Sequence, residues 1–469
     1  MKGRVFNLAG LNLKMSPYLQ QEGEMSQCVN METDMLGAKK KRPGYTTYLG
    51  TPDNNRINTL FNYTTNSGTQ FWNYRFSVGA AGTLYYSTQG TGAWTVCGGG
   101  TFAGGGSMGY ANTEDTLIIG NGVDATRHST NGTSFTNTSS APIAGYFTDF
   151  QNRIYAGGTA SSLFWSAAGT PTQWVTDSSS IQIPGPGRIN AVMKAYDRVL
   201  TSKNSGVMHR YDGDSLFDLA TELGPTSASS IATREGYRFW VNRLGIFGYG
   251  GVRPELLSNP IERQVYNDAG SGVVGTQFTN APGVSFRYDY LLGVGTVTDD
   301  LTGLTLNRGI EKYDYQLDEW GNWEFNNMPT AFGTYTDASG IQQLIFGDSA
   351  GQCYTFGGTV TTDNTATIAS RMLFYLHAGA PESDKEWKYL WLFFNPGNQA
   401  KVQVAISDTF TAGKLNWVDL GDCSDGVAEF RFPAGSRGKF LFVKIYEASR
   451  NNRFQFYGFA YDAEVIDRK

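Results

Sequence analysis

The chain has 469 residues, of which 58 are glycine, 14% are aromatic and only 17% are charged. This length suits two or three domains, and abundant glycine with abundant aromatic residues is typical of short antiparallel strands joined by tight turns. The formal net charge of −5 excludes a chain that binds nucleic acid over its whole surface. No membrane span is expected, because no run of about 18 apolar residues occurs.

The first fifty residues, 1–50, are expected to form an N-terminal arm that closes or flanks the domain after it. Their densest basic run is Lys39-Lys40-Lys41-Arg42, directly before Pro43-Gly44. Such a run can contact the phosphates of DNA that passes or rests nearby. It can equally be a solvated turn, or form salt bridges between subunits. The candidates for DNA-phosphate or intersubunit contact are therefore Lys39, Lys40, Lys41 and Arg42.

Apolar, strand-like segments recur between residues 51 and 365, each followed by a glycine-containing turn and a second such segment. Their centres lie near residues 76, 117, 154, 199, 240, 292 and 345. The spacing of roughly 40 to 50 residues is typical of β-propeller blades. One four-stranded blade cannot bury both faces alone, whereas blades packed around an axis bury them all. We therefore predict an all-β chain with a six- or seven-bladed β-propeller over 51–365.

Helical periodicity is almost absent from the chain. The best candidate for a short helix is the segment 215–223, Ser-Leu-Phe-Asp-Leu-Ala-Thr-Glu-Leu.

The pattern of the sequence changes after residue 365. An apolar run over 389–394 ends at the strong turn signal Asn395-Pro396-Gly397, and alternating apolar residues follow over 402–406. Two further strand-like runs lie at 439–445 and 454–459. This pattern predicts a separate C-terminal β-sandwich over residues 366–469.

Catalytic and metal-binding patterns are weak throughout the sequence. A serine or cysteine triad needs a histidine, and none of the three histidines lies in a nucleophile motif. The four cysteines are far apart and lack metal-ligand spacing, so we expect small buried thiols. We predict no catalytic residue, no cofactor and no metal. The residues concerned are His128, His209 and His377, with Cys28, Cys97, Cys353 and Cys423.

Glycoside hydrolysis is the enzymatic alternative, because it needs two carboxylates across a cleft. Four acidic residues lie in one aromatic-rich region, namely Asp314, Asp318, Glu319 and Glu324. Residues 87–94 and 129–135 also look like the Asp-box hairpins of sialidase-type propellers, although Gln89 and Asn131 replace the aspartate. That hairpin is a structural turn, and acidic residues are common in turns, so both features favour a propeller more than an enzyme.

The opening of the chain has a distinctive order of short motifs. It contains Gly10-Leu11-Asn12, Ser16-Pro17, Glu22-Gly23-Glu24, Val29-Asn30-Met31 and Lys41-Arg42-Pro43-Gly44-Tyr45. This order resembles the opening of the tail nozzle and tail hub proteins of short-tailed bacteriophages, the family of packaged-DNA stabilisation proteins. A second resemblance to the same family is a recurring sequence motif, which is similar to segments 150–158, 163–166 and 171–174.

The resemblance implies a virion structural protein without turnover chemistry. It implies a hexameric ring beneath the portal-adaptor protein, which extends the DNA channel and retains the packaged genome until ejection. The implied partners are that adaptor, distal tail proteins such as a fibre or needle, and transient double-stranded DNA. The implied location is the virion tail, after synthesis in the host cytoplasm. The alternative is a receptor-binding or glycan-hydrolysing, sialidase-like virion protein.

Overall fold

The structure is a computed structural model that describes most of the chain. It describes residues 1–469 except 7, 15–19, 35, 52, 65–69, 79–80, 89–90, 104–105, 176–178, 266–274, 300–301, 338, 411–414, 450–453 and 467–469. Ser16-Pro17 and Gln89 therefore lie outside the described residues. The described part is mostly β-strand, with one short α-helix, α1 (Glu262–Val265), and no helix in it is long and apolar enough to cross a membrane.

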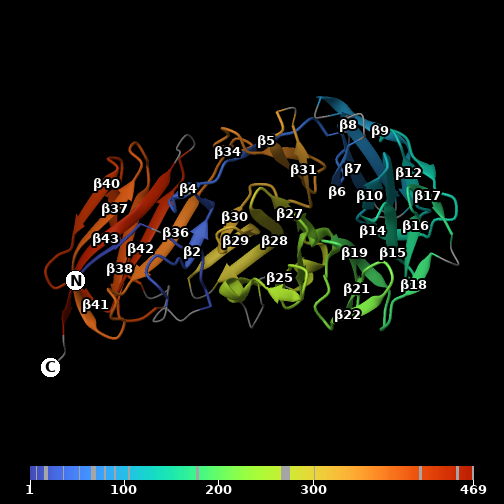
Figure 1. Cartoon of the computed structure of the whole chain (residues 1–469). Coiled ribbons are helices and arrows are strands. Elements are labelled where there is room, and N and C mark those ends of the chain that lie inside the picture. Colours follow the sequence, from blue (N-terminus) through green and yellow to red (C-terminus); the bar gives the residue numbers. More distant parts are fainter. Residues whose placement is uncertain are drawn as a thin grey trace.

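Five sheets are built only from consecutive antiparallel strands and form blades of a β-propeller (Figure 1). Each strand pairs with the next one along the chain, apart from β18, which pairs with β16. The five sheets comprise β6 (Ile57–Thr64), β7 (Gln70–Val78), β8 (Ala81–Thr88) and β9 (Thr91–Ala103); β10 (Gly109–Thr113), β11 (Thr116–Gly120), β12 (Arg127–Ser129) and β13 (Thr136–Asn137); β14 (Ala144–Phe150), β15 (Arg153–Gly158), β16 (Ser162–Ala167), β17 (Thr170–Trp174) and β18 (Ser180–Gln182); β19 (Ile189–Ala195), β20 (Arg198–Lys203), β21 (Met208–Tyr211) and β22 (Leu216–Ala220); and β23 (Ala232–Arg234), β24 (Tyr237–Asn242), β25 (Gly245–Tyr249) and β26 (Pro254–Leu256).

Two further units repeat the same up-and-down order but belong to larger sheets. The first comprises β27 (Gly283–Phe286), β28 (Asp289–Asp299), β29 (Leu304–Asp314) and β30 (Glu319–Glu324). The second comprises β31 (Ala331–Thr336), β32 (Gln342–Gly347), β33 (Cys353–Phe356) and β5 (Tyr45–Thr47) from the N-terminal segment, continued by β34 (Thr362–Asp363) and β35 (Ala366–Thr367). Strand β31 contacts both β27 and β6, so the last unit lies beside the first.

The seven apolar segments recognised in the sequence are strands, and each is the second strand of its unit. They are β7, β11, β15, β20, β24, β28 and β32. The described side chains of these strands are mostly buried: all five residues of β11 and the last five of β20 are buried. Strands buried in this way contact neighbouring sheets on both faces, which is why their apolar residues are recognisable in the sequence.

The predicted helix over 215–223 is wrong, because this segment contains strand β22. Phe217 lies opposite Arg210 of β21, and the guanidinium of Arg210 lies 4.8 Å from the centre of the Phe217 ring. Pairing with β21 therefore outweighs the local spacing of apolar residues, which is typical of two turns of helix.

The C-terminal residues form two sheets that share one core. One is the continuation of the β27–β30 sheet through β2 (Gln27–Val29) into β36 (Ser370–Leu376), β42 (Phe440–Glu447), β38 (Lys401–Ser407) and β39 (Val418–Asp422). The other contains β1 (Lys2–Val5), β3 (Met31–Thr33), β4 (Lys39–Lys41), β43 (Gln455–Ile466), β37 (Asp384–Phe394), β40 (Val427–Arg431) and β41 (Arg437–Gly438). Phe374 of the first sheet stacks on Phe459 of the second, with ring centres 4.8 Å apart.

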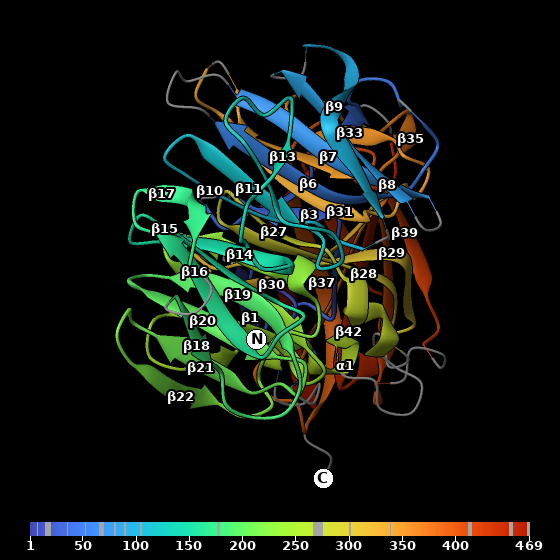
Figure 2. The same ribbon diagram turned by 90° about the vertical axis from the view of Figure 1, so that its right-hand side faces the viewer.

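The N-terminal segment joins the C-terminal sheets to the propeller. Strand β2 lies between β30 and β36, so one sheet runs from a propeller unit into the C-terminal half. Strands β1 and β4 both pair with β43, while β5 pairs with β33. Residues 1–50 therefore contribute strands to both halves, and residues 366–469 share their core with the rest of the chain. Figure 1 shows the C-terminal sheets at one end of an elongated molecule, and Figure 2 views it from the propeller end.

Gly44 lies where the N-terminal segment passes closest to the strand that follows the last propeller unit. A Cβ atom at this position would overlap the backbone carbonyl of Thr362, whereas a Cβ atom at Gly50 would meet no atom within 4 Å. We expect Gly44→Ala to lower the free energy of unfolding by about 1–3 kcal/mol, as overpacking does in other proteins. Gly50→Ala is the matched control and should change it by less than about 0.5 kcal/mol. Equal stability of the two variants in urea unfolding would contradict the close approach at Gly44.

Candidate functional site: the N-terminal ion pairs and the axial cavity

The basic run of the N-terminal segment begins on strand β4, between β3 and β43. Side chains alternate between the two faces of a strand. Lys39 and Lys41 consequently point to the buried side, while the side chain of Lys40 is 47% exposed and lies 3.7 Å from Glu32. Lys39 pairs with Glu319 at 2.9 Å, and Lys41 pairs with Glu447 at 2.8 Å.

Arg42 is fully buried and uses all of its hydrogen-bond donors. Its two terminal nitrogens bind both carboxylate oxygens of Asp363, at 2.9 and 2.6 Å. Its Nε donates to Oδ1 of Asn30 at 2.8 Å, and the terminal nitrogens also donate to the carbonyls of Pro43 and Glu324. A guanidinium in a bidentate pair with every N–H satisfied is the arrangement that a buried charge needs.

The predicted DNA-phosphate contact is wrong for Lys39, Lys41 and Arg42. Their charges are neutralised by Glu319, Glu447 and Asp363 of the same chain, and their side chains are 0–3% exposed. These pairs also lie within one chain and not between subunits. Lys40 is the member of the run that stays at the surface.

Other residues of the opening pattern also connect separate parts of the fold. Glu22 accepts hydrogen bonds from the hydroxyl of Tyr461 at 2.7 Å and from the backbone N–H of Ala378 at 2.7 Å. Asn30, with φ of 57°, donates to the carbonyl of Ala369, while its Oδ1 accepts from Arg42 and from the backbone of Glu324. The pattern that carries the resemblance is thus a set of structural contacts between the two halves.

Of the four carboxylates considered for glycoside hydrolysis, Asp314 and Glu319 lie opposite each other in the β29–β30 pair. None of the four lines either of the two cavities described below. Asp314 accepts two backbone N–H groups of its own turn, and Asp318 accepts the hydroxyl of Tyr313 at 2.8 Å. Glu319 is paired with Lys39, and Glu324 accepts the N–H of Asn307 and lies 3.6 Å from Arg371. Each carboxylate is used in a structural contact.

The histidines and cysteines have structural surroundings. Nδ1 of His128 lies 3.0 Å from the hydroxyl of Thr138, and burial lowers the pKa of that imidazole. All four cysteines are buried, as predicted. Burial raises the pKa of the Cys97 and Cys423 thiols to about 12, so neither is a thiolate at neutral pH. Within the described ranges, no group of three His, Cys, Asp or Glu side chains could hold a metal ion.

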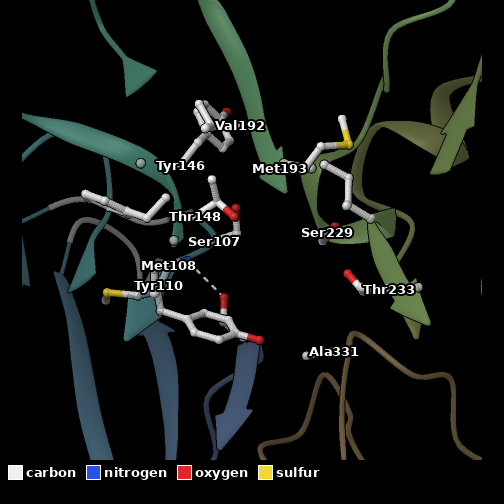
Figure 3. A pocket seen from close by; sticks show the side chains of 18 of the residues that line it. Ser107, Met108, Tyr110, Tyr146, Thr148, Val192, Met193, Ser229, Thr233 and Ala331 are labelled. Atoms are coloured by element: carbon white, nitrogen blue, oxygen red, sulfur yellow. Dashed lines mark hydrogen bonds between the residues drawn. The ribbon is translucent and has the colours of Figure 1, made fainter. Parts of the chain in front are cut away.

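An axial cavity of about 390 Å³ lies at the centre of the propeller. The first strand of every unit contributes to its wall: β6, β10, β14, β19, β23, β27 and β31. Figure 3 looks into this space, where Tyr110, Thr148, Ser229 and Thr233 from different parts of the ring border one cavity. A second cavity of about 480 Å³, the mouth, lies where the chain enters these first strands, and it shares Asn58, Ser107 and Tyr146 with the axial cavity.

The described wall of the axial cavity carries one basic and one acidic side chain, Arg238 and Asp149. Arg238 lies in its wall, and burial lowers the pKa of that guanidinium to about 10, while nearby Asp149 opposes the shift. Asp149, the one acidic residue of the described cavity wall, pairs with Lys194 at 2.9 Å. Sequence analysis missed this site because its residues are small or polar and lie at the starts of the units, where no motif marks them.

Comparisons with known proteins identify no family. The sequence matches no family model, and no curated protein matches it. Similar solved structures include a chain in the structure titled Crystal Structure of Mitotic Checkpoint Complex, at 11% identity and a TM-score of 0.42, covering 69% of this chain and 96% of the other. BamB from Moraxella catarrhalis is 10% identical with a TM-score of 0.42, covering 76% and 98%. Sqt1 from Saccharomyces cerevisiae is 8% identical with a TM-score of 0.42, covering 67% and 98%.

Arg42 provides a direct test of the N-terminal ion pairs. Arg42→Met leaves Asp363 buried without its partner, so we expect the free energy of unfolding to fall by about 3–5 kcal/mol. Lys40→Met alters the exposed neighbour in the same run and should change it by less than about 0.5 kcal/mol. Urea unfolding followed by tryptophan fluorescence measures both variants. If Arg42→Met unfolds at the same urea concentration as Lys40→Met, the ion pair does not stabilise the fold.

Glu311 provides a pH test of the buried interior. Its side chain is completely buried and accepts a hydrogen bond from Asn322 at 2.9 Å, while Oε1 has no partner among the described residues. Burial raises the pKa of Glu311 to about 8 from the usual 4.5. The folded chain therefore keeps a proton that the unfolded chain releases, and stability should decrease as pH rises from about 4.5 to about 8.

Glu311→Gln removes this proton while it keeps the shape of the side chain. We expect the wild type to lose stability relative to Glu311→Gln by up to about 1.4 kcal/mol for each pH unit within that window. Urea midpoints measured at pH 5.5, 6.5 and 7.5 give the comparison, with Glu429→Gln on the exposed strand β40 as control. Parallel pH profiles for wild type and Glu311→Gln would show that Glu311 is already ionised.

Proposed function

We propose that this protein is a non-catalytic structural component of a bacteriophage virion. It acts as a tail nozzle or hub, assembles as a ring below the portal-adaptor complex, extends the DNA channel and helps to retain the packaged genome until ejection. One observation carries the proposal: the residues that resemble the nozzle family are those that join the propeller to the C-terminal sheets. Arg42, Asn30 and Glu22 bind partners in distant parts of the chain.

The proposed building block has seven blades and a C-terminal β-sandwich. The five separate sheets are joined by the β27–β30 unit and by the unit of β31–β33 with β5, in which the N-terminal segment supplies the fourth strand. The two C-terminal sheets, with their shared core of Phe374 and Phe459, make the sandwich. Because strand β2 continues one blade into the sandwich, the two parts would move together, which suits a wall that must resist the pressure of packaged DNA.

The outer face of the sandwich offers a surface for assembly. Tyr389, Trp391 and Phe393 alternate along β37 with the buried Leu390 and Leu392, and so lie on the face away from the core. The Tyr389 and Trp391 rings stack with centres 5.3 Å apart. Aromatic residues on an exposed sheet face are typical of protein interfaces.

The same face supports a second candidate function, receptor binding. Phe6 is 49% exposed and lies over Phe393 with ring centres 5.2 Å apart, and Tyr457 is 39% exposed on the neighbouring strand β43. A flat row of rings can stack on the apolar faces of sugars as well as on protein side chains. Glycan hydrolysis has no comparable support, because each of the four candidate carboxylates is used in a structural contact.

Native mass spectrometry of the purified protein, with averaged electron microscopy of intact particles, tests the proposal. We expect a ring, hexameric by resemblance, at the end of the channel away from the portal. Trp391→Ala should shift the protein to monomers without lowering its unfolding midpoint, because the indole side chain of Trp391 lies outside the core. Val418→Ala, which changes a 58% exposed residue of the other C-terminal sheet, should keep the ring.

Other outcomes separate the two candidates. A monomer found at the particle periphery, with glycan binding that Trp391→Ala abolishes, would replace the nozzle proposal by receptor binding. A ring elsewhere in the particle, away from DNA density, would overturn the nozzle role while keeping the assembly face.

A further inference from the structure

The mouth of the propeller differs in charge from the chain as a whole. The chain has a formal net charge of −5, yet no acidic residue lies among the described residues that line the mouth. Arg56 is exposed and lines it, and Tyr146 lines both the mouth and the axial cavity. Arg188 is also exposed and lies at the rim of the mouth, directly before β19 and two residues before Asn190, which lines the mouth.

Both arginines of the mouth are available to a ligand. In the part of the chain that the structure describes, no ion pair involves the side chain of Arg56 or Arg188. Below them, Arg238 lies in the wall of the axial cavity, and the acidic Asp149 there is neutralised by Lys194. The mouth itself has a basic and no acidic residue among its described lining. A recess with one sign of charge concentrates the opposite charge, so the mouth favours an anionic group.

The walls also offer both hydrogen-bond donors and acceptors. Among the strands that the structure describes, each first strand pairs only with the second strand of its own unit, so most N–H and C=O groups of its other edge lie on the side of the cavity. Asn58 donates its side-chain N–H to the carbonyl of Gly106, which leaves its Oδ1 as an acceptor in the mouth. A peptide has N–H and C=O groups to match such a surface, whereas a phosphate group offers few donors.

The volumes of the two cavities limit which anionic ligands can enter the site. The axial cavity of about 390 Å³ and the mouth of about 480 Å³ have the volume of sites for small ligands and short segments. A DNA double helix, whose major groove alone is about 12 Å wide, cannot enter them.

We propose that the mouth and the axial cavity bind an acidic peptide segment of a partner protein. The carboxylates of the segment lie against Arg56 and Arg188 as charge-assisted, bidentate hydrogen bonds, and its main chain binds the strand edges below. This site is separate from the aromatic face of the sandwich and does not depend on ring assembly. It gives the propeller a way to hold a partner at its axis while the sandwich makes other contacts.

Fluorescence anisotropy with the full-length protein tests the proposal. The probe is a rhodamine-labelled hexapeptide of alternating glycine and glutamate, and its counterpart carries glutamine in place of glutamate. We expect the glutamate peptide to bind at least tenfold more tightly than the glutamine peptide. The double variant R56Q/R188Q should lose at least tenfold in affinity, whereas R437Q, which changes an exposed arginine of the C-terminal sheets, should bind like the wild type.

A second variant blocks the site without touching a charge. Ser107 is exposed and lines both cavities, so S107W should fill them and abolish binding while it leaves the melting temperature unchanged. Equal binding of the glutamate and glutamine peptides, or equal loss in R56Q/R188Q and R437Q, would overturn the proposal. Tripolyphosphate that binds the wild type and not R56Q/R188Q, while the glutamate peptide fails to bind, would replace the peptide by a phosphate ligand. The ring state seen by mass spectrometry is a separate readout, so either proposal can fail alone.

Discussion

The fold depends on burying the positive charge of Arg42. A buried guanidinium without partners costs several kcal/mol, so the chain must bring Asp363, Asn30 and two backbone carbonyls to one point. Those groups come from the N-terminal segment, from the strand after the last propeller unit, and from the end of β30. The observed arrangement satisfies every donor of Arg42 and so holds the N-terminal segment in place where it crosses the junction.

Lys39 and Lys41 extend the same constraint along β4. Each is paired with a carboxylate on a different part of the fold, Glu319 at the start of β30 and Glu447 at the end of β42. A strand held by charges at three points cannot slip in register by one residue, because a slip would put Lys40 inside and two charges outside. The N-terminal segment therefore makes the propeller and the C-terminal sheets parts of one core.

The two ends of the molecule have different surfaces, which is why we assign them different contacts. The outer face of the C-terminal sheets carries stacked aromatic rings, suited to a flat partner. At the propeller mouth, Arg56 forms no ion pair with any described residue, which suits the acidic segment proposed above.

The sequence alone determined the class of fold, through the second strand of each unit. Segments such as Thr116–Gly120 are buried on both faces, so their apolar character is visible without knowledge of the partners. The tertiary structure decided what local patterns could not. The segment 215–223 contains a strand because β21 pairs with it. Three members of the basic run, Lys39, Lys41 and Arg42, are buried because carboxylates hundreds of residues away in the sequence pair with them. The axial cavity likewise arises only when the ring closes, since its arginines and strand edges are adjacent in space and scattered in sequence.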